Sequence, residues 1–167
     1  MSAITIGIAT YNREKLLKRA VKSVINQSFQ NFKIIIGNDY TEKKILKKNI
    51  GINDPRIKIF NHKKNLGERK NMNFLLNKSN SKWFTWLADD DFFEPKFFEK
   101  LFSCLKKYKK TNVVASYSNY KRMEKKKYKK IKKKIIVDPL IFDQINFLTN
   151  YSCKRLRLIG TYGIIKT

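Results

Sequence analysis

Short runs of apolar residues alternate along this chain with segments in which apolar residues recur at helical spacing, and this alternation most limits the possible folds. The first run, residues 4–9, is rich in β-branched side chains and ends at a polar break. From Arg13 the period changes, with Leu17 and Val21 on one face of a predicted helix and lysines on the other. We therefore expect an α/β fold with an open, mostly parallel sheet that helices cover on both faces.

The same patterns predict the remaining elements. Further strands are expected at residues 32–37, 56–60, 83–87, 113–117 and 160–165. Further helices are expected over residues 68–77, 95–105 and 140–148. Asn12 is expected to cap the first helix, because its side chain can accept from the free N–H groups there. Pro95 is expected in the first turn of its helix, and Cys104 is expected to be a small core residue.

The composition excludes several classes of protein. Of the 167 residues, 42% are hydrophobic, which is enough for a core and excludes a disordered tail. Two cysteines and one histidine give neither a zinc cluster nor a disulfide framework. Neither a signal peptide nor an apolar run long enough to span a bilayer is visible. We therefore expect a cytoplasmic protein, with peripheral attachment at the inner face of the cell membrane as an option.

The net charge of +25 has two interpretations. It can reflect a compositional bias toward lysine on neutral surfaces, or attraction to an anionic partner such as an acidic membrane. The basic run 121–134 is either a solvated hairpin or loop, or a contact with an anionic membrane or acceptor. It is built mainly of lysine and has few aromatic residues, so specific nucleic-acid binding is not expected.

Polar side chains follow three of the expected strands, at residues 10–12, 38–39 and 89–91. The carboxyl ends of parallel strands meet at one edge of a sheet, where ligands bind in folds of this class. The sequence therefore predicts that these three clusters converge on one site.

Three adjacent carboxylates, Asp89, Asp90 and Asp91, form the strongest of these clusters. Neighbouring carboxylates repel one another, and carboxylate oxygens at a strand end suit a hard divalent cation that also takes phosphate oxygens. The alternative is an acidic cap for the helix near Pro95, and Asp91 is the best candidate for that role.

Three further side chains have both a binding and a purely structural interpretation. Asp39 can accept from the imide of a uracil base or from a ribose hydroxyl, or it can form an Asx-turn before Thr41. Tyr11 can stack on a base, or it can be an ordinary aromatic at the end of a strand. Arg69 can balance a diphosphate at a helix start, or it can be one of many solvated cations.

Taken in order, these segments resemble glycosyltransferase family 2, which comprises inverting enzymes with the GT-A fold, including those of spore-coat and surface-polysaccharide biosynthesis. The resemblance covers residues 4–105. It rests on residues 6–13, 16–24, 27–29, 31–39, 65–67 and 87–91, followed by Pro95.

The resemblance implies a nucleotide-diphosphate sugar as donor, commonly a UDP-sugar, a glycan or lipid-linked acceptor, and Mn²⁺ or Mg²⁺. It implies that Ala9, Thr10, Tyr11 and Asn12 line the nucleoside, with the aromatic ring packed on the base. Asp39 matches the acid that recognises the base.

Asp89 and Asp90 match the family's DXD-type pair, the first nearer the ribose and the second nearer the metal. Asp90 and Asp91 are the expected metal ligands. An Arg-Asn pair that is frequent in the family is Met72-Asn73 here, so Arg69 is the substitute candidate for the diphosphate.

The resemblance identifies no catalytic base in this chain. The matching acid would follow a strand similar to residues 160–165, so a C-terminal truncation is expected. The expected division is a donor-binding core over residues 1–120 and an incomplete acceptor-side region over residues 121–167. The alternative is a basic module on the same fold that binds nucleic acid or a membrane surface without catalysis. A nucleotidyltransferase is disfavoured, because the chain has no glycine-rich phosphate loop.

Overall fold

The computed structural model describes residues 2–107, 115–117 and 163–166. The elements follow one another in the order β1 Ile4–Thr10, α1 Glu14–Ile25, β2 Phe32–Asn38, α2 Lys47–Ile50, β3 Ile57–Asn61, α3 Glu68–Asn77, β4 Trp83–Trp86, α4 Phe97–Lys107, β5 Ala115–Tyr117 and β6 Gly163–Lys166.

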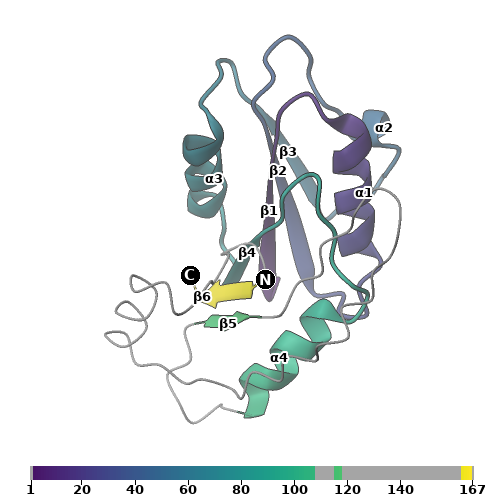
Figure 1. The fold of residues 1–167 in the computed structure, drawn as a ribbon, viewed down its shortest axis with the longest axis vertical. Helices are drawn as coiled ribbons and strands as arrows, with labels where there is room; N and C mark the ends of the chain where they lie inside the picture. Colours follow the sequence, from purple (N-terminus) through teal and green to yellow (C-terminus); the bar gives the residue numbers. More distant parts are fainter. Residues whose placement is uncertain (1, 108–114, 118–162, 167) are drawn as a thin grey trace, which may run out of the picture.

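The strands form one six-stranded sheet in the order β3-β2-β1-β4-β6-β5. The first four strands of this order are parallel, whereas β6 runs antiparallel to both β4 and β5. Helices α1 and α3 lie on opposite sides of the sheet (Figure 1). The predicted α/β fold with a mostly parallel, doubly covered sheet is confirmed.

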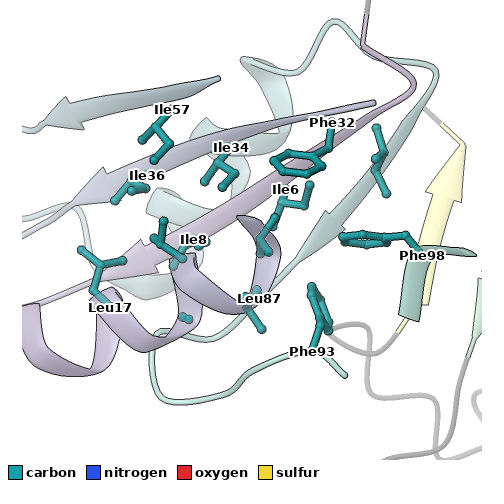
Figure 2. Close-up of a cluster of buried hydrophobic side chains, with 14 of the residues drawn as sticks. Ile6, Ile8, Leu17, Phe32, Ile34, Ile36, Ile57, Leu87, Phe93 and Phe98 are labelled. Carbon is teal, nitrogen blue, oxygen red and sulfur yellow. The ribbon is translucent and has the colours of Figure 1, made fainter. Parts of the chain in front are cut away.

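Alternate side chains of β1 point to the same face of the sheet, and one set faces the core beneath α1. Ile4, Ile6 and Ile8 are fully buried and belong to the large core cluster beneath α1, which includes Leu17. Figure 2 shows this cluster, with Phe93 and Phe98 on its right-hand side, away from Leu17. Burial of each such side chain contributes about 1.5–3 kcal/mol, so the requirement that these three isoleucines face the large cluster fixes the register of β1.

The opposite face is thinner and rests on a smaller cluster of Ile35, Leu75 and Phe84. Gly7 of β1 lies on this face, where a Cβ would be 2.6 Å from the Phe84 Cζ and 3.3 Å from the Leu75 Cβ. Glycine at this position therefore lets α3 pack directly on the sheet.

Four details differ from the sequence predictions. Asn12 does not cap α1, because its backbone is left-handed with φ of 52°, and Arg13 takes the N-cap position without a side-chain cap. Helix α4 begins at Phe97, beyond Pro95, after a turn closed by a 2.9 Å bond from Phe97 N to Glu94 O. Cys104 is exposed, since α4 buries the face that contains Phe98 instead. The short helix α2 was not predicted.

Several predicted segments fall outside the described residues, among them the basic run 121–134 and the helix 140–148. Of the strands predicted at 113–117 and 160–165, the structure describes residues 115–117 and 163–166. Within the described ranges no helix is both long and apolar enough to cross a membrane.

A partly buried, forked ion pair between Asp54 and Arg56 gives a pH-dependent prediction. Arg56 donates from Nε to Asp54 Oδ1 at 3.0 Å and from Nη2 to Oδ2 at 2.7 Å. These bonds hold the pKa of Asp54 below its usual 3.8. Because the folded-state pKa is the lower one, the stabilisation is complete above pH 3.8 and disappears as the pH falls through the folded-state value.

Asp54→Asn is therefore expected to lower the free energy of unfolding by about 1 kcal/mol at pH 7. The difference in free energy of unfolding between the wild type and Asp54→Asn should become steadily smaller below about pH 4. Urea denaturation at a series of pH values measures this, with Glu99→Gln as the charge-matched control. A gap that stays constant down to the acid transition would contradict the assignment.

Candidate functional site

A cavity of about 430 Å³ opens at the carboxyl ends of β1, β2 and β4, between these strands and the start of α3. Sixteen residues line it: Gly7, Ala9, Thr10, Tyr11, Arg13, Asp39, Asn65, Gly67, Glu68, Asn71, Met72, Trp86, Leu87, Ala88, Asp89 and Asp90. The three polar clusters therefore converge on one site, as the strand order of an open α/β sheet requires.

Asp39 is almost fully buried at this cavity and holds the loop that leads into α3. Its Oδ1 accepts from Leu66 N at 2.7 Å and its Oδ2 accepts from Gly67 N at 2.8 Å. Its own N–H donates to Thr10 O at 3.0 Å, which ties the ends of β1 and β2 together. The Asx-turn considered for this position is made by Asn38, whose Oδ1 accepts from Tyr40 N at 3.1 Å.

Asp89 is buried, and each of its carboxylate oxygens has a partner at the end of β1 or just beyond it. Thr10 Oγ1 donates to Oδ2 at 2.7 Å, and Arg13 Nη1 donates to Oδ1 at 3.2 Å. The same Nη1 lies 3.5 Å from Asp90 Oδ2. Asp90 itself is half exposed and faces the cavity, so the two acids occupy different environments.

The loop after β4 is also held from α1. Arg19 donates to the backbone carbonyl of Asp90, and its guanidinium lies 5.6 Å from the ring centroid of Phe92. Phe93 N donates to Ser23 Oγ at 3.1 Å. Helix α1 therefore holds the backbone of the loop that carries Asp90.

Asp91 has a different place from its two neighbours. Its N–H closes a turn onto Ala88 O at 3.1 Å, and it does not line the cavity. The alternative role as a cap for the next helix is wrong, since α4 begins only at Phe97.

The donor set suits a divalent ion that arrives with further ligands. In the described part of the chain, no group of three or more His, Cys, Asp or Glu side chains is arranged to hold a metal. Mg²⁺ and similar ions are commonly held by one or two carboxylates together with water and phosphate oxygens. Asp90, with a half-exposed carboxylate in the cavity, fits that pattern, whereas both oxygens of Asp89 already accept hydrogen bonds.

Tyr11 lies at the rim of the site, and the ring of Tyr40, which is outside the lining, packs against it. Tyr11 is 51% exposed and meets the Tyr40 ring edge-on, with 5.2 Å between centroids. Tyr40 donates from its hydroxyl to Glu42 Oε2 at 2.5 Å, and this bond raises the pKa of the phenol. The exposed Tyr11 ring is therefore supported from one side only.

Of the residues that the sequence predicted for the site, six line the cavity and three do not. Those in the lining are Ala9, Thr10, Tyr11, Asp39, Asp89 and Asp90. Those outside it are Asn12, Arg69 and Asp91. Arg69 is exposed near the start of α3, so the structure gives no support to it as the substitute for the missing arginine.

Sequence reasoning missed Arg13, Asn71 and Trp86. Asn71 Nδ2 donates to Gly37 O at 2.9 Å, and its Oδ1 lies 3.0 Å from His62 Nε2. The signal for Arg13 was the rarity of arginine in a lysine-rich chain, since a retained guanidinium often serves a planar, forked contact that lysine cannot make. No pattern indicated Asn71, whose partners come from other elements.

The cavity is acidic although the protein is strongly basic. Its lining holds four carboxylates, on Asp39, Glu68, Asp89 and Asp90, and one guanidinium, on Arg13. The chain as a whole has a net charge of +25. An anionic ligand in this cavity would therefore need an added cation.

The comparisons with known proteins agree with this geometry. Residues 5–163 match the family model described as "Glycosyl transferase family 2". An uncharacterised glycosyltransferase of Haemophilus influenzae is 31% identical over 68% of this chain and 36% of its own length. The GalNAc(5)-diNAcBac-PP-undecaprenol beta-1,3-glucosyltransferase of Campylobacter jejuni is 34% identical over 54% of this chain and 30% of its own length. The chain thus spans about a third of these relatives.

Solved structures share the fold at low sequence identity. S. aureus TarS 1–349 in complex with UDP has a TM-score of 0.56 at 18% identity, over 65% of this chain and 33% of that one. A mannosyltransferase from Pyrobaculum calidifontis, in complex with GDP-Man and Mn²⁺, has a TM-score of 0.56 at 11% identity, over 68% and 34%. With the family match over nearly the whole sequence, these findings show that the chain belongs to glycosyl transferase family 2 and has the GT-A fold.

Proposed function

We propose that this chain binds a nucleotide-diphosphate sugar, with a UDP-sugar as the first candidate, and takes part in inverting transfer of the sugar to a glycan or lipid-linked acceptor. Family membership and the cavity at the strand ends support this. TarS structures contain UDP or UDP-GlcNAc, and the Campylobacter jejuni relative is named for an undecaprenol-linked acceptor. No base for the acceptor hydroxyl is assigned among the described residues.

The arrangement of the lining suggests how such a donor would lie. The base would stack on the exposed ring of Tyr11, near the buried carboxylate of Asp39. The ribose would lie toward Asp89, and the diphosphate toward Asp90. Aromatic stacking of this kind is worth about 1–3 kcal/mol per base, so the rim would supply much of the affinity for the nucleoside.

One observation carries the proposal that binding depends on a divalent cation: four carboxylates and a single guanidinium line the cavity. A diphosphate placed beside Asp90 would be repelled unless a cation lay between them. Asp90 is the residue that would hold Mn²⁺ or Mg²⁺, with phosphate oxygens completing the coordination. When bound, such an ion acts as a Lewis acid that stabilises the departing diphosphate.

Titration calorimetry tests this on the whole chain. UDP is expected to bind in the presence of Mn²⁺ and to bind at least about tenfold more weakly in excess EDTA, since roughly 1.4 kcal/mol of charge compensation is lost. Asp90→Asn should reproduce the EDTA result with Mn²⁺ present. Glu99→Gln in α4 removes the same charge elsewhere and should bind as the wild type does.

If UDP and GDP both fail to bind with Mn²⁺ present, the donor-site proposal is wrong. The alternative, a basic module without catalysis, would instead bind DNA or anionic vesicles in a manner that weakens steeply with salt and ignores Mn²⁺. Peripheral contact with an anionic membrane on the cytoplasmic side remains compatible with donor binding, and vesicle sedimentation at two salt concentrations tests it separately.

A further inference from the structure

We propose that Arg13 is the resident counter-cation of the Asp89–Asp90 pair, and that it disfavours a divalent ion until a nucleotide diphosphate arrives to take up its guanidinium. The inference rests on the donor site proposed above and adds an order of binding to it. The metal would enter together with the nucleotide rather than before it.

The distances place one guanidinium nitrogen between two carboxylates. Arg13 Nη1 is 3.2 Å from Asp89 Oδ1 and 3.5 Å from Asp90 Oδ2. The other oxygen of Asp89 accepts from Thr10 Oγ1 at 2.7 Å, so this buried acid is satisfied by protein groups alone. A positive charge at this point removes much of the repulsion between adjacent carboxylates, which a metal would otherwise relieve.

The Asp90 carboxylate lies close to Arg13, on a loop whose backbone is held in place. The backbone carbonyl of Asp90 is bonded to Arg19, which fixes the loop against α1. A divalent ion that binds the half-exposed Asp90 carboxylate must therefore sit near the Arg13 guanidinium or displace it. Two cations at such separation repel, and this repulsion lowers the affinity of the bare protein for the ion.

A nucleotide diphosphate changes this balance. Among the residues lining the cavity, Arg13 carries the only positive charge, and Met72 occupies the position where the family often has arginine. A guanidinium binds phosphate oxygens in a planar fork, and its side chain is half exposed and able to swing. Once Arg13 contacts the diphosphate, Asp90 is free for the ion, and by linkage each ligand raises the affinity for the other.

Electron paramagnetic resonance of free Mn²⁺ measures this directly, without any transfer reaction. The variants are Arg13→Met, Arg13→Lys and, as the charge-matched control on the same helix, Lys22→Met. Without nucleotide, Arg13→Met is expected to bind Mn²⁺ roughly tenfold more tightly than the wild type, because a nearby positive charge is gone. Arg13→Lys keeps the positive charge but lacks the planar guanidinium, so its gain in Mn²⁺ affinity should be smaller. Lys22→Met should have the Mn²⁺ affinity of the wild type.

Added UDP should raise the Mn²⁺ affinity of the wild type more than that of Arg13→Met. The wild type should then bind Mn²⁺ more tightly than without UDP. Arg13→Met should show a smaller enhancement, because it keeps coordination by the phosphate oxygens but lacks the guanidinium that leaves Asp90 for the diphosphate. Circular dichroism tests whether each variant is folded. If Arg13→Met is unfolded, Arg13→Lys alone still decides, through its higher Mn²⁺ affinity without UDP and its smaller enhancement with UDP.

Equal Mn²⁺ affinities for the wild type and both Arg13 variants, with and without UDP, would overturn the inference. The donor site would survive that result if UDP still bound in a manner dependent on Mn²⁺. Conversely, if the wild type binds no nucleotide but Arg13→Met still gains Mn²⁺ affinity, the counter-cation role stands while the exchange with a diphosphate and the donor proposal both fall.

Discussion

Gly37→Ala is expected to lower the free energy of unfolding by about 3 kcal/mol, which corresponds to a fall in melting temperature of roughly 6–12 °C. A Cβ on Gly37 would lie 2.0 Å from Asn71 Oδ1, so the Asn71 side chain must leave its place. It would give up its 2.9 Å bond to Gly37 O and its contact with His62. The overpacking and the lost buried hydrogen bond act in the same direction.

A double-mutant cycle separates this cause from a general intolerance of β2 to substitution. In an Asn71→Ala background the clashing oxygen is absent, so adding Gly37→Ala should cost clearly less than it does alone. Thermal denaturation of the four proteins gives the coupling energy. Strictly additive effects would show that the side chain of Asn71 is not what excludes a Cβ at this position.

Asp39→Asn is expected to lower the free energy of unfolding by about 3 kcal/mol. It should also weaken UDP binding at least tenfold. Both carboxylate oxygens accept backbone N–H groups, from Leu66 and Gly67. An amide has only one acceptor oxygen, so its NH₂ group must face one of these donors. The loop that begins α3 and lines the cavity through Gly67 would then shift.

The two readouts together show how Asp39 acts. If it works through the loop, stability and UDP affinity should fall in parallel. If Asp39→Asn stays as stable as the wild type and only loses UDP affinity, then it acts by direct contact with the nucleotide, and the loop argument is wrong. Asp54→Asn removes a hydrogen-bonded carboxylate that does not line the cavity, so it controls the UDP affinity for the loss of a charge.

The sheet and its helices could be predicted from the sequence because their signals are local. The apolar run at residues 4–9 and the helical spacing of Leu17 and Val21 lie within windows of a dozen residues. The convergence of Asp39 and Asp89 on one cavity followed from strand topology alone.

What could not be predicted depends on partners that are distant in the sequence. Arg13 meets Asp89 across 76 residues, and Asp39 meets Gly67 across 28. The left-handed backbone of Asn12 likewise follows from how β1 turns into α1 rather than from a capping preference. Periodicity identifies elements and the edge at which a site forms, but not which side chains meet there.

The cavity is acidic whereas the protein as a whole is basic, so different charges would control the association rate of the proposed nucleotide and the lifetime of its complex. A net charge of +25 would attract the proposed anionic nucleotide from beyond contact distance and would raise its association rate at low ionic strength. Inside the cavity, four carboxylates oppose it unless a divalent ion accompanies it. For the proposed donor complex, added monovalent salt is therefore expected to slow association, whereas removal of the divalent ion is expected to shorten the lifetime of the complex.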